Sequence, residues 1–222
     1  MSRLRVINLG LPKSGTTTLG NALKSAGLKV ADHRIRARQT DDPEIARLFV
    51  GDLLYRGYFH TGDPLAELEE FDAVAEVSHL AGKHSVWPQM DFGLIEAIRE
   101  HHPGVRFVAT QRRAKALSRS MLAWSNMSQR LEQADIPGLP HGYGHTTVER
   151  VMWIKAHYAH LRRLFRGHSD QYLELDVAAP DAREQLSDYL GIEVPWWGRA
   201  NVNPDGLGAD MDDEDEDEDA EA

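Results

Sequence analysis

The segment INLGLPKSGTTTLGNAL, residues 7–23, restricts the fold more than any other part of the chain. Its apolar start predicts a buried strand over residues 4–9, and the pattern after the glycine-containing turn predicts a helix that ends at Gly27. A strand, a tight turn and a helix in series form the unit from which parallel sheets are built. The chain therefore begins like an α/β protein.

The same order of elements recurs further along the chain. Buried strands are predicted at residues 28–31, 71–77, 105–110 and 171–176, and helices at residues 88–102, 112–131, 146–165 and 179–190. The helix at 146–165 has Val148 and Met152 on its apolar face, which we expect to pack. Strands that alternate with helices predict a three-layer α/β fold of the P-loop type, with a central parallel sheet flanked by helices.

The charge of the chain is concentrated at its end. Residues 210–222 hold ten of the 35 acidic residues, and the remaining acids equal the 25 lysines and arginines in number. An acidic block of this kind repels itself and has nothing to bury, so we predict a disordered acidic tail at residues 209–222. With 222 residues in all, the rest forms one domain, residues 1–208, whose balanced charge gives no reason to expect nucleic acid as a partner.

Cysteine is absent, which excludes disulfides, thiolate metal sites and a cysteine nucleophile. No segment holds the eighteen or so consecutive apolar residues that a membrane span needs, and the apolar run near the start is too short for a signal peptide. We therefore expect a cytoplasmic protein without a membrane span.

The turn after the first strand contains the chemistry of an anion site. In a Walker A loop the lysine follows the last glycine, but here Lys13 precedes Gly15 and the threonines. Gly15 still lets the backbone approach an anion, and hydroxyls follow at the start of a helix. The pattern predicts a phosphate-binding turn that departs from the usual nucleotide kinase loop.

The motif PKSGTT after a strand resembles the 5′-phosphosulfate loop of sulfotransferases that use 3′-phosphoadenosine 5′-phosphosulfate (PAPS), in particular the short bacterial members. The resemblance implies that Lys13 contacts the bridging oxygen and the 5′-phosphate. It also implies a set of residues that hold the phosphate oxygens: Ser14, Gly15, Thr16, Thr17 and Thr18.

A second motif, FVATQRRAKALSRSML, supports this resemblance. In the family, an arginine just past a buried strand and a serine eight residues later clamp the 3′-phosphate of the cofactor, and Arg112 and Ser120 match that spacing. A bidentate arginine with a hydroxyl suits a dianion and needs no metal. The proline that usually follows the arginine is missing, and Arg113 is a second candidate, out of register with Ser120 by one residue.

The closing segment RANVNP resembles the carboxyl-terminal loop of the short bacterial members. In those proteins the residues of this loop lie near the cofactor or the acceptor. On that ground Arg199, Asn201 and Asn203 are further candidates for the cofactor site.

Sulfuryl transfer also needs a base for the acceptor hydroxyl, and the family uses His, Glu or Asp between the two phosphate motifs. Glu76 and His79 follow the predicted third strand, and His33 follows the second. We rank Glu76 first, His79 second and His33 third, with His84 behind them. Each of these residues has an ordinary structural role as its alternative.

The resemblance implies a sulfotransferase that moves the sulfuryl group from PAPS to a hydroxyl or amine of a small-molecule or glycan acceptor, without a metal. Residues 34–70 and the Gly/Pro-rich loop at 134–145, which could serve as a flap, are expected to build the acceptor pocket. Trp124 could stack on the adenine, but we predict core packing for it. The rivals are a P-loop nucleotide-dependent kinase with a rearranged loop and a non-catalytic nucleotide-binding protein.

Overall fold

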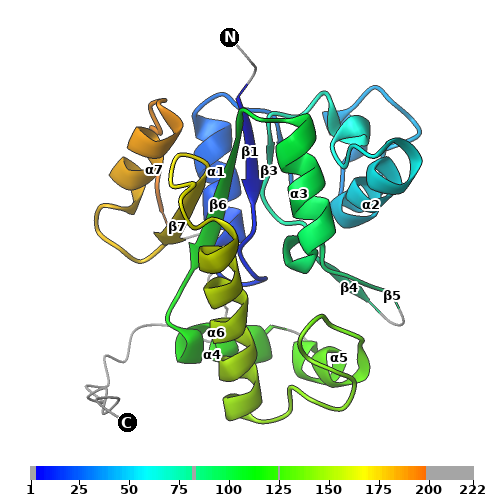
Figure 1. Cartoon of the computed structure of the whole chain (residues 1–222), viewed down its shortest axis with the longest axis vertical. Helices are drawn as coiled ribbons and strands as arrows, with labels where there is room; N and C mark the ends of the chain where they lie inside the picture. Colours follow the sequence, from blue (N-terminus) through cyan, green and yellow to red (C-terminus); the bar gives the residue numbers. More distant parts are fainter. Residues whose placement is uncertain (1–3, 82–83, 125, 199–222) are drawn as a thin grey trace.

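The computed structural model describes residues 4–81, 84–124 and 126–198. Its central sheet has five parallel strands in the order β2-β3-β1-β6-β7 (Figure 1). These strands are β1 Arg5–Asn8, β2 Val30–Ala31, β3 Ala73–Val74, β6 Val105–Gln111 and β7 Tyr172–Asp176. The predicted parallel sheet is confirmed. A separate antiparallel hairpin, β4 His79–Ala81 and β5 His84–Val86, was not predicted from the sequence.

Helices cover both faces of the sheet, so the predicted three-layer α/β architecture is confirmed. One layer contains α1 Thr16–Ser25 and α7 Ala182–Leu190, and the other contains α2 Val50–Thr61, α3 Phe92–His101 and α6 Thr147–Leu164. Two short helices, α4 Ala114–Leu122 and α5 Met127–Gln133, lie beyond the carboxyl ends of the strands (Figure 1). Single 3₁₀ turns occur at η1 Ala37–Gln39, η2 Ala66–Leu68 and η3 Pro88–Met90. None of the described helices has the length and apolarity that a membrane crossing requires.

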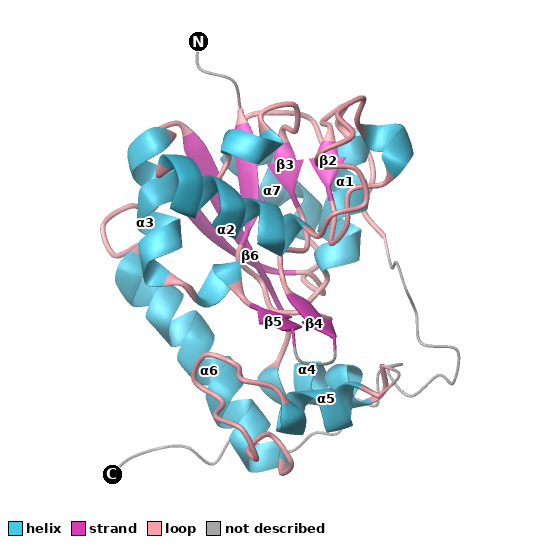
Figure 2. Ribbon diagram, turned by 90° about the vertical axis from the view of Figure 1, so that its right-hand side faces the viewer, coloured by secondary structure: helices cyan, strands magenta, loops and turns pink. Residues whose placement is uncertain are grey.

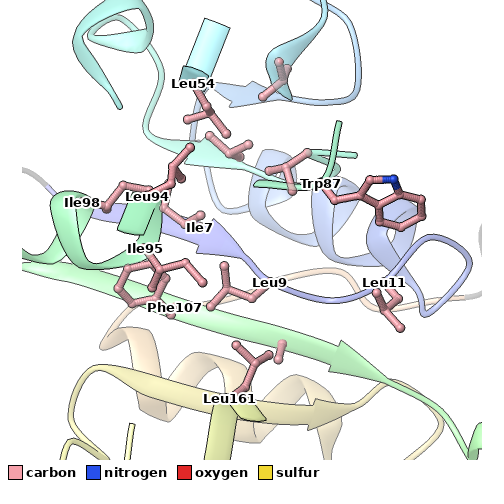
Figure 3. Packing of buried hydrophobic residues seen from close by; sticks show 14 of the residues in the cluster. Ile7, Leu9, Leu11, Leu54, Trp87, Leu94, Ile95, Ile98, Phe107 and Leu161 are labelled. Atoms are coloured by element: carbon pink, nitrogen blue, oxygen red, sulfur yellow. The ribbon is translucent and has the colours of Figure 1, made fainter. Parts of the chain in front are cut away.

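Two apolar clusters hold the layers together. Val6 of β1 packs with the α1 and α7 layer, whereas its neighbour Ile7 packs with the opposite layer. Figure 3 shows this second cluster, in which Phe107 of β6 lies against Ile95 of α3. Because both faces of the sheet are covered, the central strands β1 and β6 bury successive residues on both faces, and such apolar runs can be recognised in a sequence.

The strand order determines where a ligand can bind. The chain leaves β1 through α1 toward β2 on one side, and later passes from β3 to β6 on the other side of β1. The connections that follow β1 and β6 therefore diverge to opposite faces of the sheet. Ligands of open α/β sheets bind in the crevice that forms at such a point, outside the carboxyl ends of the strands.

The helix predicted at residues 112–131 is divided into α4 and α5. The backbone amide of Trp124 donates to Met121 O at 3.2 Å, and the amide of Met127 donates to Trp124 O at 3.1 Å, so the chain turns between the two helices. α5 then buries Met127 and Leu131 against the core.

The prediction for the packed face of α6 is wrong. Val148 and Met152 are 68% and 66% exposed, whereas Trp153 and Ile154 are buried. Two polar residues, Arg150 and His157, share the buried face and satisfy their hydrogen bonds there. These polar residues conceal the true apolar face from a periodicity argument.

This assignment predicts a contrast between neighbouring positions of α6. Ile154→Ala removes buried apolar volume and should lower the free energy of unfolding by about 2–4 kcal/mol. Met152→Gln, at an exposed position, should change it by less than about 0.5 kcal/mol. Urea unfolding of both variants measures the difference. Equal destabilisation by the two substitutions would contradict this orientation of the helix.

Candidate functional site

Asn8, the last residue of β1, organises the crevice and was not singled out from the sequence. Its side chain is completely buried. The amide nitrogen donates to Ala75 O at 2.7 Å, and the amide oxygen accepts from the backbone amides of Gly10 at 3.0 Å and Thr110 at 3.2 Å. One side chain thus ties the end of β1 to the segments that follow β3 and end β6.

The loop between β1 and α1 requires glycine at two positions. A Cβ on Gly10 would lie 2.6 Å from Thr110 O. Gly15 has φ 115°, and a Cβ at this position would clash with the side chain of Val177. The hydroxyl of Ser14 shares a 2.7 Å hydrogen bond with the Thr110 hydroxyl, and its amide donates to Leu11 O at 3.1 Å. Ser14 therefore uses both groups to shape the loop.

Lys13 stands in the left-handed backbone region, with φ 69°. This conformation is unfavourable for a residue with a Cβ, and such strain is found mainly at functional sites. Burial, followed by the charge of Arg112, lowers the pKa of Lys13. Its Nζ lies 5.3 Å from the centroid of the Trp124 ring. Trp124 is 41% exposed, so the predicted core packing of this residue is wrong.

The first turn of α1 carries the threonines of the motif. Thr16 forms a side-chain hydrogen bond with Glu76, and the hydroxyl of Thr18 donates to Gly198 O at 3.1 Å. Thr17 is half-buried. The amino terminus of a helix attracts anions through its backbone amides and its dipole, so this end of α1 suits a phosphate or sulfate group.

Arg112 follows β6 and lies close enough to Lys13 for its charge to lower the pKa of that lysine further. Arg113, in contrast, is exposed at the start of α4. Among the described residues, no hydrogen bond or ion pair occupies the Arg112 guanidinium, and none joins it to Ser120, which is buried in α4. The structure thus brings Arg112 rather than Arg113 beside the β1 loop.

Glu76 follows β3 and faces the start of α1. Its Oε1 accepts hydrogen bonds from the Ser78 amide at 3.0 Å and the Ser78 hydroxyl at 2.6 Å. Burial raises the pKa of Glu76 to about 7, and the nearby carboxylate of Asp32 adds to this effect, although the hydrogen bonds oppose it. A carboxyl group with this pKa can accept and release a proton near neutral pH.

The candidate histidines form an aromatic cluster next to Glu76. His33 donates from its backbone to Glu76 O at 2.9 Å, and its ring lies 5.6 Å from that of His79. His79 is buried and stacks on Phe49, with 3.6 Å between ring centroids, and its Nδ1 has no hydrogen-bond partner among the described residues. Burial, followed by the charge of His33, lowers the pKa of His79. His84, in contrast, is exposed and bonds to Asp52 at 2.7 Å.

The Gly/Pro-rich loop at residues 134–145 is attached to α6. Arg150, a buried residue, donates to Gly144 O and His145 O, each at 2.8 Å. Trp153 Nε1 donates to Pro137 O at 2.9 Å, and the Gly144 amide donates to the Glu149 carboxylate at 3.1 Å. These bonds hold the loop in one path along the helix.

His157 and Tyr158 of α6 form hydrogen bonds to the backbone at the ends of β1 and β6, and neither contact was predicted from the sequence. His157 Nε2 donates to Leu9 O at 2.8 Å, and Tyr158 Oη donates to Thr110 O at 2.7 Å. Burial lowers the pKa of His157 to about 4, so its ring is neutral at neutral pH. The local sequence around these two residues resembles any helix and contains no signal for backbone partners so distant along the chain.

Three predicted residues of the closing segment, Arg199, Asn201 and Asn203, lie outside the described residues, as does the acidic tail at 209–222.

The neutral His157 predicts a pH dependence of stability. Between pH 6.5 and about 4 the unfolded chain protonates this group and the folded chain does not, so stability falls as the pH decreases, by up to about 3 kcal/mol. His157→Gln should keep a donor toward Leu9 O without titrating. Urea unfolding at several pH values should show a smaller decline for the variant. Parallel declines would contradict the proposed protonation state.

A scan against protein-family models and a search of the curated proteins find no match to this chain. The fold and the geometry of the crevice are therefore the observations from which a function is inferred.

Proposed function

We propose that the chain is a PAPS-dependent sulfotransferase that transfers the sulfuryl group to a hydroxyl or amine. The observation that carries the proposal is the pairing of Lys13 and Arg112 at the amino terminus of α1. Burial lowers the pKa of Lys13, and the nearby charge of Arg112 lowers it further. Two cations and a helix amino terminus that converge on one crevice favour a ligand with several negative charges.

The two cations come from neighbouring strand ends, which suits a ligand with two separate anionic groups. Lys13 belongs to the loop after β1, beside α1, and Arg112 follows β6. On this proposal Lys13 neutralises the charge that develops on the leaving 5′-phosphate, and Arg112 binds the 3′-phosphate. Neither role requires a metal, because the positive charge is supplied by side chains.

Glu76 is the proposed base. It contacts Thr16 at the start of α1, so its carboxylate lies beside the anion-binding turn, and its pKa is about 7. Glu76 accepts the proton of the acceptor hydroxyl as the acceptor oxygen bonds to sulfur. The bond between sulfur and the 5′-phosphate oxygen breaks, and adenosine 3′,5′-bisphosphate leaves. His79 remains the second candidate, because no residue in the described part of the chain forms a hydrogen bond with its Nδ1.

Binding of adenosine 3′,5′-bisphosphate tests the two anion sites. By calorimetric titration without metal, the wild-type chain should bind, and Lys13→Ala and Arg112→Ala should each weaken the affinity at least tenfold, or about 1.4 kcal/mol. Arg113→Ala is the matched control, because its side chain is exposed next to Arg112, and should leave the affinity unchanged.

Other outcomes of this titration would reject the assignment. If the chain binds ATP only with magnesium and does not bind the bisphosphate, the kinase hypothesis replaces the sulfotransferase proposal. Equal losses in the Arg112 and Arg113 variants would show that the register of the second motif is wrong.

The proton-accepting role of Glu76 predicts a measurable titration. In ¹³C NMR of protein labelled at its glutamate carboxyl groups, one signal should titrate near pH 7 and disappear in Glu76→Gln. With 2-naphthol as the probe acceptor and PAPS as donor, Glu76→Gln should lower kcat at least about 100-fold. His79→Gln, which removes the second candidate, should retain most of the activity. A larger loss in the His79 variant would assign the base to histidine.

A further inference from the structure

Besides Lys13, a second cationic side chain, Arg130, packs against the Trp124 ring. Arg130 belongs to neither of the two phosphate motifs that the proposed function uses. Arg130 of α5 places its Cζ 5.5 Å from the centroid of this ring, and Lys13 Nζ lies 5.3 Å from the same centroid. The ring therefore connects the loop after β1 with α5. Cation–π contacts of this kind hold a side chain in place while leaving most of its hydrogen-bonding capacity unused.

The guanidinium of Arg130 is only partly satisfied by the protein. Nη1 donates to Leu80 O of the hairpin at 2.8 Å, whereas Nε is enclosed and has no hydrogen-bond partner among the described residues. Within the described part of the chain, Nη2 makes no hydrogen bond and no carboxylate forms an ion pair with Arg130. Because the side chain is only partly buried, the Nη2 end of this charged group is available to an anion from outside the protein.

The neighbours of Arg130 place it on the side of the candidate bases. Its charge acts on His79, which begins β4, and the buried Nδ1 of His79 has no hydrogen-bond partner within the ranges that the structure describes. Figure 2 shows the hairpin between the carboxyl end of the sheet and helices α4 and α5. Arg112, by contrast, is grouped with Lys13 at the strand ends. Arg130 thus shares the Trp124 ring with Lys13, but its own hydrogen bond goes to the hairpin, next to His79.

We propose that Arg130, supported by the Trp124 ring, binds an anionic substituent of the acceptor, so that the acceptor is a hydroxyl compound that already carries a carboxylate or sulfate. This inference rests on the proposed sulfotransferase function and adds the chemical class of the acceptor. A bidentate guanidinium recognises either anion in the same way. The subsite holds the anionic substituent on the side of His79 and leaves the donor to Lys13 and Arg112.

A matched pair of ligands tests the subsite. We would saturate the full chain with adenosine 3′,5′-bisphosphate and titrate it with 4-nitrophenyl β-glucuronide and with 4-nitrophenyl β-glucoside, which differ in one carboxylate. The glucuronide should bind at least tenfold more tightly. Arg130→Gln should abolish this preference, Arg130→Lys should retain part of it, and Trp124→Leu should reduce it. Arg119→Gln, an exposed arginine of α4, is the control and should change nothing.

Affinity for the bisphosphate separates this inference from the proposed function. Arg130→Gln should bind the bisphosphate as the wild type does, which also shows that the variant is folded. If the wild type binds the bisphosphate but does not prefer the glucuronide, or binds neither sugar, the acceptor subsite is rejected and the sulfotransferase proposal stands. If Arg130→Gln weakens bisphosphate binding, Arg130 belongs to the donor site and the subsite is equally rejected. If the wild type does not bind the bisphosphate, both the acceptor subsite and the sulfotransferase proposal are rejected.

Discussion

The crevice depends on one buried amide. Asn8 has no access to water, so each of its hydrogen bonds must be made inside the protein, and all of them go to the backbone or side chains at strand ends. The amide fixes the separation between the segments that carry Glu76 and Arg112, and it also holds Gly10 at the start of the loop. The positions of the acid and the cations relative to one another therefore follow from a residue that carries no charge.

Local patterns were sufficient to predict the sheet and the strand–turn–helix unit. The central strands β1 and β6 bury residues on both faces, and Gly15 and Gly27 mark the two ends of α1 with positive φ angles. Glu76 and His33 follow neighbouring parallel strands, and the structure places them side by side, with the His33 amide donating to Glu76 O at 2.9 Å. Their roles in catalysis stay predictions.

The parts that could not be predicted depend on contacts between distant positions. His157 bonds to a backbone carbonyl 148 residues away, and such a partner leaves no trace in the local sequence. The same holds for Arg150, whose charge made the buried face of α6 resemble a polar one. Trp124 was misread for the opposite reason, since a large aromatic residue in a helical pattern is usually buried, and here it supports two cations.

Arg150 has a consequence for how the loop at residues 134–145 can change. One guanidinium holds two of its carbonyl groups, and neither bond involves a loop side chain. The loop path is therefore fixed by the helix together with the buried loop residues Ile136 and Leu139, whereas the side chains of His141 and Tyr143 are exposed and take no part in this packing. Selection or a protein engineer can exchange these side chains and alter what the loop contacts while its backbone stays in place. At these exposed positions, loop composition and loop shape are separately adjustable.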